Sequence, residues 1–203
     1  MSESEGASHY FDDTPQTASK RRSIELVLPD TFLALETDAG VFSGAKVDAG
    51  TKYLLLDMPE IPPDTGAILD LGCGYGPIAL TAARRCPTAN VWAVDINARA
   101  RELTSDNASA NGLTNVTVAA PEDVPSDLRF DLILSNPPIR IGKAALHALL
   151  GTWLPTLTEA GRAWMVVQKH LGSDSLATWL TEQEWPTTRL GSRKGYRLLE
   201  TTR

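Results

Sequence analysis

Asp70-Leu71-Gly72-Cys73-Gly74-Tyr75-Gly76 is the stretch of this 203-residue chain that decides its fold. It joins a short apolar run, residues 67–71, to a stretch of helical pattern, residues 78–85. In a doubly wound sheet such a turn lies at the carboxyl edge, where ligands bind. Glycines there allow the backbone to approach a ligand, and the Asp70 carboxylate can accept hydrogen bonds from an ammonium group. The alternative is a glycine-rich turn without a ligand.

The rest of the chain alternates between short apolar runs and helical stretches. The predicted strands are residues 67–71, 91–95, 116–119, 130–135 and 163–168, and the predicted helices are 78–85, 98–111, 143–154 and 173–184, with Ser173 as the candidate N-cap of the last helix. This alternation is typical of a parallel sheet covered on both faces by helices. Residues 191–195 are too few for a crossover helix, so strands 187–190 and 196–200 must pair antiparallel. We therefore predict a doubly wound α/β fold with five parallel strands and a terminal antiparallel hairpin.

Three segments precede this alternation. Residues 1–20 are polar and are expected to form a flexible tail. Residues 24–28 and 32–35, split by Pro29-Asp30, predict a hairpin, and residues 48–58 predict a short helix that stops at Pro59. The expected organisation is a tail (1–20), an N-terminal extension packing on the main domain (21–59), and the main domain (60–203).

The composition is that of a globular protein, with 42% hydrophobic and 22% charged residues. No apolar run approaches the roughly 20 residues needed to cross a bilayer, and the polar N-terminus does not resemble a secretory signal. We therefore expect a cytoplasmic protein without a membrane partner. Cys73 and Cys86 lie in different predicted elements without metal-ligand spacing, so no metal site is predicted.

The net charge of −6 argues against tight nonspecific binding to nucleic acid, which depends on neutralising phosphates. Any contact with nucleic acid must therefore be local. Two basic clusters could provide it, unless they are ordinary solvated surface: Lys20, Arg21 and Arg22, and Arg189, Arg193, Lys194, Arg197 and Arg203.

The spacing of the glycines narrows the choice of cofactor. A dinucleotide fingerprint has the order G-x-G-x-x-G, whereas here G-x-G-x-G follows an aspartate. The Asp70 carboxylate would oppose a phosphate but suits a cofactor with an amino group and a sulfonium. Asp95 ends the second strand and is placed to accept both hydroxyls of a ribose. Its alternative role is that of a strand-end or helix-capping residue.

Ser135-Asn136-Pro137-Pro138-Ile139 follows the fourth strand and therefore also lies at the carboxyl edge. Proline has no N–H and biases the preceding residue towards extended geometry. The amide oxygen of Asn136 and the carbonyl of Pro137 thus form two acceptors that converge on one donor-rich group, as an exocyclic amine is. Holding both N–H bonds orients the nitrogen lone pair towards a methyl group. The alternative is a rigid turn that ends a strand.

Together, the glycine loop, Asp95 and Asn-Pro-Pro-Ile resemble the motifs of class I amino-methyltransferases. Four further features are similar to the branch that methylates guanine N2 in 16S ribosomal RNA, the small-subunit methyltransferase C-like family. They are Gly40-Val41-Phe42-Ser43, Asp48 with Gly50, the leucines at 54–56, and Gly195-Tyr196-Arg197. The resemblance extends from about residue 23 to the end of the chain.

The resemblance implies S-adenosylmethionine as methyl donor, a seven-strand Rossmann-like sheet, and a methyltransferase domain over residues 60–203. The expected catalytic segment is Asn136, Pro137, Pro138 and Ile139. The expected cofactor-binding residues are Asp70, Gly72, Gly74, Gly76, Asp95, Ile96, Ala120 and Phe42, the last in a segment that helps to close the site.

At two positions this sequence departs from the family. Ile139 replaces an aromatic residue, so the target base must be stacked elsewhere or packed against aliphatic groups. Ala119-Ala120-Pro121 lacks the acidic residue that often contacts adenine, which leaves that contact to backbone or to Glu122 and Asp123.

The expected partner is RNA, either small-subunit ribosomal RNA or an assembly particle. The same chemistry would serve a tRNA base, a DNA adenine or a protein glutamine. A nicotinamide-dependent oxidoreductase is disfavoured by the glycine spacing and by the absence of a proton-relay Tyr and Lys pair. A noncatalytic RNA-binding module is disfavoured because Asn136 and the loop are both intact. The sequence predicts no oligomeric state.

Overall fold

The computed structural model describes residues 18–42 and 46–203. Most of the expected tail, residues 1–20, and Ser43 of the family motif lie outside the described residues. The division into extension and main domain stays a prediction.

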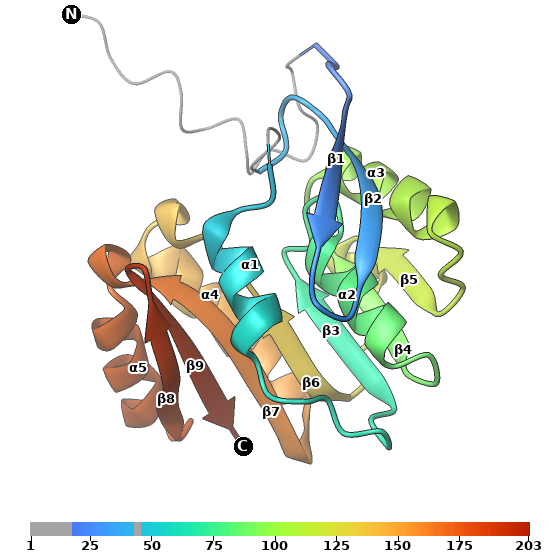
Figure 1. Cartoon of the computed structure of the whole chain (residues 1–203). Coiled ribbons are helices and arrows are strands. Elements are labelled where there is room, and N and C mark those ends of the chain that lie inside the picture. The colour runs from blue at the N-terminus through green and yellow to red at the C-terminus, as the bar shows by residue number, and fades with distance from the viewer. Residues whose placement is uncertain (1–17, 43–45) are drawn as a thin grey trace, which may run out of the picture.

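The main sheet has the strand order β5-β4-β3-β6-β7-β9-β8 (Figure 1). The first five strands in this order, β5, β4, β3, β6 and β7, are parallel, and β9 runs antiparallel to its neighbours β7 and β8. This confirms the doubly wound seven-strand sheet with its terminal hairpin. The strands are β3 (Ala67–Leu71), β4 (Asn90–Val94), β5 (Val116–Ala119), β6 (Phe130–Ser135), β7 (Leu157–Gln168), β8 (Thr187–Arg193) and β9 (Tyr196–Thr202).

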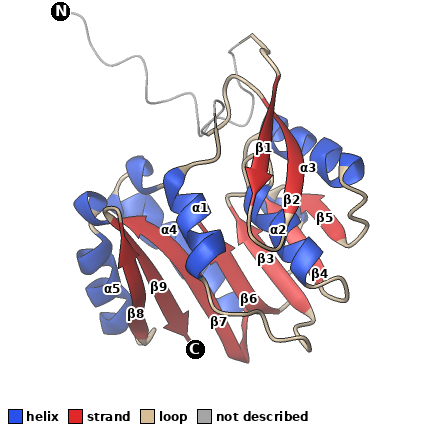
Figure 2. Cartoon of the chain, in the orientation of Figure 1, coloured by secondary structure: helices blue, strands red, loops and turns tan. Residues whose placement is uncertain are grey.

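Helices cover both faces of the sheet (Figure 2). On one face lie α1 (Ala49–Asp57), α2 (Pro77–Arg85) and α3 (Ala98–Ala110), and on the other α4 (Lys143–Trp153) and α5 (Ser173–Glu182). Side chains of a strand alternate between the two cores: Ile68 packs on the first face and its neighbour Leu69 on the second, both fully buried. The described residues also form four short 3-10 helices: η1 (Pro121–Asp123), η2 (Ile139–Ile141), η3 (Leu154–Thr156) and η4 (Lys169–Leu171).

The predicted N-terminal hairpin forms from β1 (Arg22–Val27) and β2 (Phe32–Thr37). Two asparagines one turn apart on α3 bind the free edge of β2. Asn107 exchanges hydrogen bonds with the backbone of Glu36, and Asn111 does so with the backbone of Ala34. The amide side chains satisfy backbone groups that an unpaired edge would expose. The hairpin is thereby fixed against the sheet domain.

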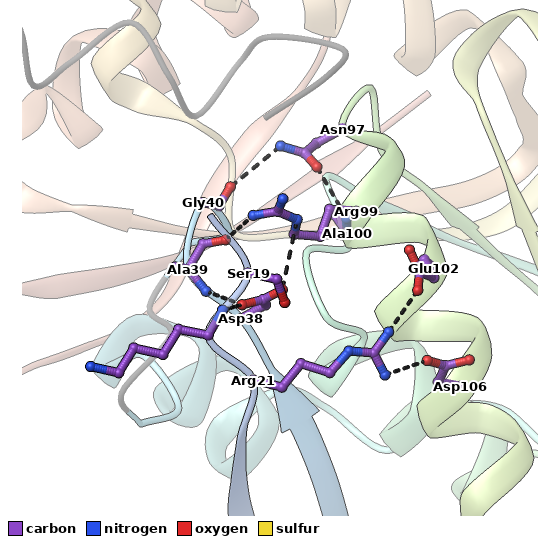
Figure 3. A network of polar contacts seen from close by, with 11 residues as sticks. Ser19, Arg21, Asp38, Ala39, Gly40, Asn97, Arg99, Ala100, Glu102 and Asp106 are labelled. Atoms are coloured by element: carbon purple, nitrogen blue, oxygen red, sulfur yellow. Dashed lines mark hydrogen bonds and ion pairs between the residues drawn. The ribbon is translucent and has the colours of Figure 1, made fainter. Parts of the chain in front are cut away.

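A polar network then fixes the segment that follows the hairpin (Figure 3). Arg99 donates to the carbonyl of Ala39 at 2.6 Å and lies 3.7 Å from the Asp38 carboxylate, which is only 3% exposed. Asn97, which also caps α3, donates to the carbonyl of Gly40 at 3.4 Å. The chain is thus held beside the end of β4, two residues before Phe42.

The structure differs from the expected elements at two places. Strand β7 begins at Leu157 instead of residue 163: Leu157 pairs with Phe130, residues 158–161 form an irregularity in the pairing with β6, and the register resumes with Arg162 opposite Leu132. The suggested N-cap Ser173 is wrong: Gly172 is the cap, and the buried Ser173 hydroxyl has no partner in the described structure. No helix among the described residues is long and apolar enough to cross a membrane.

Candidate functional site

The glycine loop, which connects β3 to α2, packs against the end of the neighbouring strand β4. The backbone N–H groups of Gly72 and Cys73 both donate to the carbonyl of Val94, at 2.8 and 3.0 Å. Gly72 and Gly74 have φ of +78° and +59°, and a Cβ at either would meet nothing within 4 Å. These two glycines therefore leave open space where the backbone could approach a ligand.

At Gly76, glycine is required by packing within the protein and not by open space for a ligand. Its φ is +92°, and a Cβ there would lie 2.6 Å from Leu80 Cδ1 and 3.0 Å from Thr104 Cγ2. The residue is buried at the start of α2. The absence of a side chain at Gly76 thus allows helix packing, whereas its expected contact with the cofactor stays a prediction.

Asp70 is fully buried behind the loop. One carboxylate oxygen accepts from Ala79 N at 2.8 Å, and the other, Oδ1, has no partner among the described residues. Burial raises the pKa of the Asp70 carboxyl to about 8; the Ala79 N–H opposes the rise and the nearby Asp95 carboxylate adds to it. An unsatisfied buried carboxyl of this kind suits a cationic ligand that would complete its hydrogen bonds.

This pKa predicts a pH-dependent stability. Because the folded-state pKa lies above that of an unfolded aspartate, the folded protein keeps a proton that the unfolded chain loses between about pH 4 and pH 8. The contribution of Asp70 to the free energy of unfolding should be complete below this window and fall as the pH rises through it. Thermal melting of the cofactor-free wild type and Asp70→Asn should show the variant gaining in relative stability from about pH 5 to pH 8. A constant difference in melting temperature would mean that Asp70 titrates as an ordinary carboxyl.

Asp95 closes the loop from the other side. Its two oxygens accept from Gly74 N and Asn97 N, both at 2.9 Å. Burial raises its pKa, and these two hydrogen bonds oppose the rise. Each carboxylate oxygen keeps a further lone pair, so Asp95 can hold the loop and still accept from a ribose.

The three other expected cofactor contacts lie around the same edge. Ile96 follows Asp95 and is 49% exposed, and Phe42 is 53% exposed. Ala120 is buried, and its neighbour Ala119 accepts from Asp95 N at 3.4 Å. The exposed apolar surface of Ile96 is available to a ligand, while Ala120 offers mainly backbone.

Asn136 at the end of β6 is oriented by helix α1. Its amide Nδ2 donates to Asp48 Oδ2 at 2.9 Å and to Thr51 Oγ1 at 3.0 Å. The same Asp48 oxygen caps α1 by accepting from Gly50 N and Thr51 N. Since a carboxylate has no hydrogen to donate, the atom facing Asp48 must be the amide nitrogen. The Asn136 carbonyl oxygen, which receives no hydrogen bond from any described residue, is therefore left as an acceptor.

The residues after Asn136 turn sharply. Pro138 has φ −75° and ψ +71°, an inverse γ-turn in which Ile139 N donates to the Pro137 carbonyl at 2.8 Å. The sequence suggests that the Pro137 carbonyl is free to accept from a substrate amine. In the structure it already accepts from Ile139 N, and one lone pair of the oxygen is left for a substrate. Ile139 packs against the core beneath α4 and α5.

Sequence reasoning assigned no role to two further side chains near Asn136. Thr51 orients the Asn136 amide. The feature of the sequence that could have indicated Thr51 is Asp48, a capping-type residue three positions earlier at the start of an apolar helix. Tyr196 packs so closely on the start of α1 that a Cβ on Gly50 would lie 2.7 Å from its ring. Burial raises the Tyr196 pKa, and the neighbouring Asp48 carboxylate adds to the rise.

The predicted C-terminal basic cluster is largely engaged within the protein. Arg193 pairs with Asp57, Arg197 with Asp174, and Arg203 donates to the carbonyl of Leu157. Only Arg189 and Lys194 of that cluster lack a side-chain partner among the described residues. The described residues contain no cluster of His, Cys, Asp and Glu that could hold a metal ion.

Comparison with known proteins matches the chain to a family of methyltransferase domains. The family described as "Methyltransferase small domain" matches residues 33–200. The "Uncharacterized protein YbxB" of Bacillus subtilis is 36% identical over 195 residues, which cover 95% of this chain and 96% of that protein. The ribosomal RNA small subunit methyltransferase C of Aeromonas hydrophila is 39% identical over 127 residues, covering 62% of this chain and 36% of that enzyme.

A solved structure shares the fold over nearly the whole chain. It is the Thermus thermophilus 16S rRNA N2 G1207 methyltransferase (RsmC) in complex with AdoMet and guanosine, with a TM-score of 0.77 and 25% identity. The alignment covers 93% of this chain and 52% of that one. The chain thus spans about half the length of this enzyme.

Proposed function

The chain belongs to the methyltransferase small domain family, and we propose that it transfers a methyl group from S-adenosylmethionine to the exocyclic N2 amine of a guanine in small-subunit ribosomal RNA. One observation carries this proposal. The Asn136 amide is held by Asp48 and Thr51 with its carbonyl oxygen left to accept from a substrate amine. The similar Thermus enzyme, a 16S rRNA N2 G1207 methyltransferase in complex with AdoMet and guanosine, supports the choice of base.

The residues around the glycine loop fit this cofactor. Bound S-adenosylmethionine supplies an electrophilic methyl group on a sulfonium. Asp70 Oδ1, buried and unsatisfied in the described structure, suits the amino group, and the open space at Gly72 and Gly74 allows close approach of the backbone. Asp95 keeps lone pairs for the ribose hydroxyls. Each of these assignments is part of the proposal.

Asn136 would act by orienting a poor nucleophile. The lone pair of a guanine amine is delocalised into the ring, and an N–H held by the Asn136 oxygen orients the amine so that this lone pair points towards the methyl group. The free lone pair of the Pro137 carbonyl can accept the second N–H. S-adenosylmethionine held by the glycine loop would supply the methyl group and keep the electron pair of its carbon–sulfur bond, and the amine, once bonded to the methyl carbon, would lose a proton to solvent. Positive charge on the amine strengthens both hydrogen bonds during the reaction.

Asp95→Ala should weaken S-adenosylmethionine binding by about 1–3 kcal/mol, because the ribose loses its acceptor. Isothermal titration calorimetry measures this, with Asp30→Ala as a control that also removes one carboxylate, in the β1–β2 turn beside Arg85 at the end of α2. Unchanged affinity in Asp95→Ala would remove Asp95 from the site. Since Asp95 also binds Gly74 N, thermal melting must show that the apo variant is folded.

The substrate class can be tested with purified components. Methyl-labelled S-adenosylmethionine is incubated with the protein and, separately, unmodified small-subunit ribosomal RNA, assembled small subunits, tRNA, DNA and protein. We expect label in ribosomal RNA or in the assembled subunit, recovered as N2-methylguanosine after digestion. Label confined to tRNA, DNA adenine or protein glutamine would contradict the proposed substrate, and binding of a nicotinamide cofactor instead would contradict the reaction class.

A further inference from the structure

The cations of this acidic protein differ in whether other residues engage their side chains. Many arginines are engaged: in the described part of the chain, ion pairs hold Arg21, Arg85, Arg99, Arg162, Arg193 and Arg197. By contrast, no described residue forms a hydrogen bond or ion pair with the side chains of Arg140, Lys143, Lys169 or Lys194, all of which are exposed. We call these four residues the basic rim.

The basic rim is continuous although its members come from three parts of the chain. Arg140 lies in η2, close enough to Tyr196 to lower the pKa of that phenol. Lys169 N donates to the Gly195 carbonyl at 2.7 Å, which places Lys169 beside the β8–β9 turn that carries Lys194. Lys143 shares a hollow of about 110 Å³ with Leu171, two residues after Lys169.

All four residues lie at the edge of the sheet that carries Asn136. Arg140 and Lys143 follow β6, as Asn136 does, and Lys169 follows β7. Tyr196 pairs with Gln168, the last residue of β7, so the β8–β9 turn lies at this edge too (Figure 1). The basic rim therefore extends from the reacting centre towards α5.

The backbone at Lys194 gives an independent indication of function. Lys194 and Gly195 form the two-residue turn between β8 and β9, and both have positive φ, 48° and 83°. Asparagine, aspartate and glycine are preferred in such a turn, and a lysine there costs roughly 1 kcal/mol. A strained position that nonetheless carries a charge is consistent with a role outside folding.

We propose that the basic rim binds the phosphates of the RNA strand adjoining the target nucleotide. Asp174 pairs with Arg197 and Asp57 with Arg193, and the Asp48 carboxylate is engaged by the N–H groups of Asn136, Gly50 and Thr51. In the described structure, none of these carboxylates forms an ion pair with the basic rim. Arginine and lysine side chains without partners are the groups that can exchange solvent for phosphate. This inference rests on the proposed function, because it takes RNA as the substrate.

A double variant tests the inference at two members of the basic rim. Lys169→Gln combined with Lys194→Asn removes two charges while giving the turn a residue it prefers. We expect RNA affinity at low salt to fall about tenfold and the slope of log affinity against log salt to decrease by about 1.4, at roughly 0.7 for each phosphate contact. The melting temperature should stay the same or rise, which excludes unfolding as the cause.

The matched control removes two charges at the opposite edge of the sheet. Arg84→Gln with Arg129→Gln should keep wild-type affinity and salt slope, because Arg84 lies in the last turn of α2 and Arg129 precedes β6, both away from the edge that carries Asn136. The measurement is fluorescence anisotropy with a labelled single-stranded RNA that contains guanine, on full-length protein. If both double variants lose affinity equally, or neither does, the basic rim is not the RNA surface, although the proposed function stands. If the wild type fails to bind RNA, both proposals fail.

Discussion

Asn136→Ala is expected to slow methyl transfer at saturating S-adenosylmethionine by about 100- to 1000-fold, the effect of losing one hydrogen-bond partner of a transition state. Cofactor affinity should change little, because the glycine loop, Asp70 and Asp95 are left in place. Single-turnover transfer of labelled methyl groups to RNA measures the rate, and titration calorimetry measures the affinity.

Two further variants separate orientation from the loss of an acceptor. Asn136→Asp keeps an acceptor oxygen and should lose less activity than Asn136→Ala, although its charge would face the Asp48 carboxylate. Thr51→Val removes one of the two groups that hold the amide and keeps the side-chain shape, so it should slow the reaction only about tenfold. A folded Asn136→Ala protein with nearly wild-type turnover would contradict the proposed chemistry.

Gly76→Ala should be the most destabilising small substitution in the glycine loop. The new Cβ would collide with Leu80 and Thr104 at a backbone conformation that L-residues avoid. Left-handed strain and overpacking together should cost about 2–4 kcal/mol. In a domain of this size the melting temperature should fall by roughly 5–15 °C.

Gly74→Ala is the matched comparison. Gly74 also has positive φ, but its Cβ would meet nothing within 4 Å. We expect a smaller loss of stability, about 1–2 kcal/mol, together with weaker S-adenosylmethionine binding, because the methyl group would occupy the space left for the ligand. Equal melting temperatures for the two variants would show that Gly76 is not needed for helix packing.

The elements of the fold that depend on patterns of neighbouring residues could be predicted from the sequence. The loop between residues 70 and 76, the alternating strands and helices, and the short connection over residues 191–195 each carry their signal within a few residues, although β8 extends to Arg193 and leaves only Lys194 and Gly195 in the turn. The early start of β7 was missed, because residues 158–162 (Thr-Glu-Ala-Gly-Arg) form no apolar run, and only the pairing of Leu157 with Phe130 makes this segment part of the sheet. The cap at Gly172 was missed because its neighbour Ser173 is the commoner capping type.

The arrangement of the candidate site depends on contacts that sequence spacing does not reveal. Thr51 and Asn136 are 85 residues apart, and only the packing of α1 across the end of β6 brings them together. The ion pairs of Arg193 and Arg197 are likewise tertiary, so the free cations could not be distinguished from the engaged ones by composition. The identity of Asn136 was predictable, but the side chains that orient it were not.

The most direct test of the account is mass spectrometry of ribosomal RNA nucleosides from cells with the protein, without it, and with Asn136→Ala in its place. We predict that N2-methylguanosine in small-subunit ribosomal RNA decreases when the protein is absent. Wild-type protein should restore it, and Asn136→Ala should not. An unchanged level of N2-methylguanosine in that RNA across all three strains would contradict the proposed function.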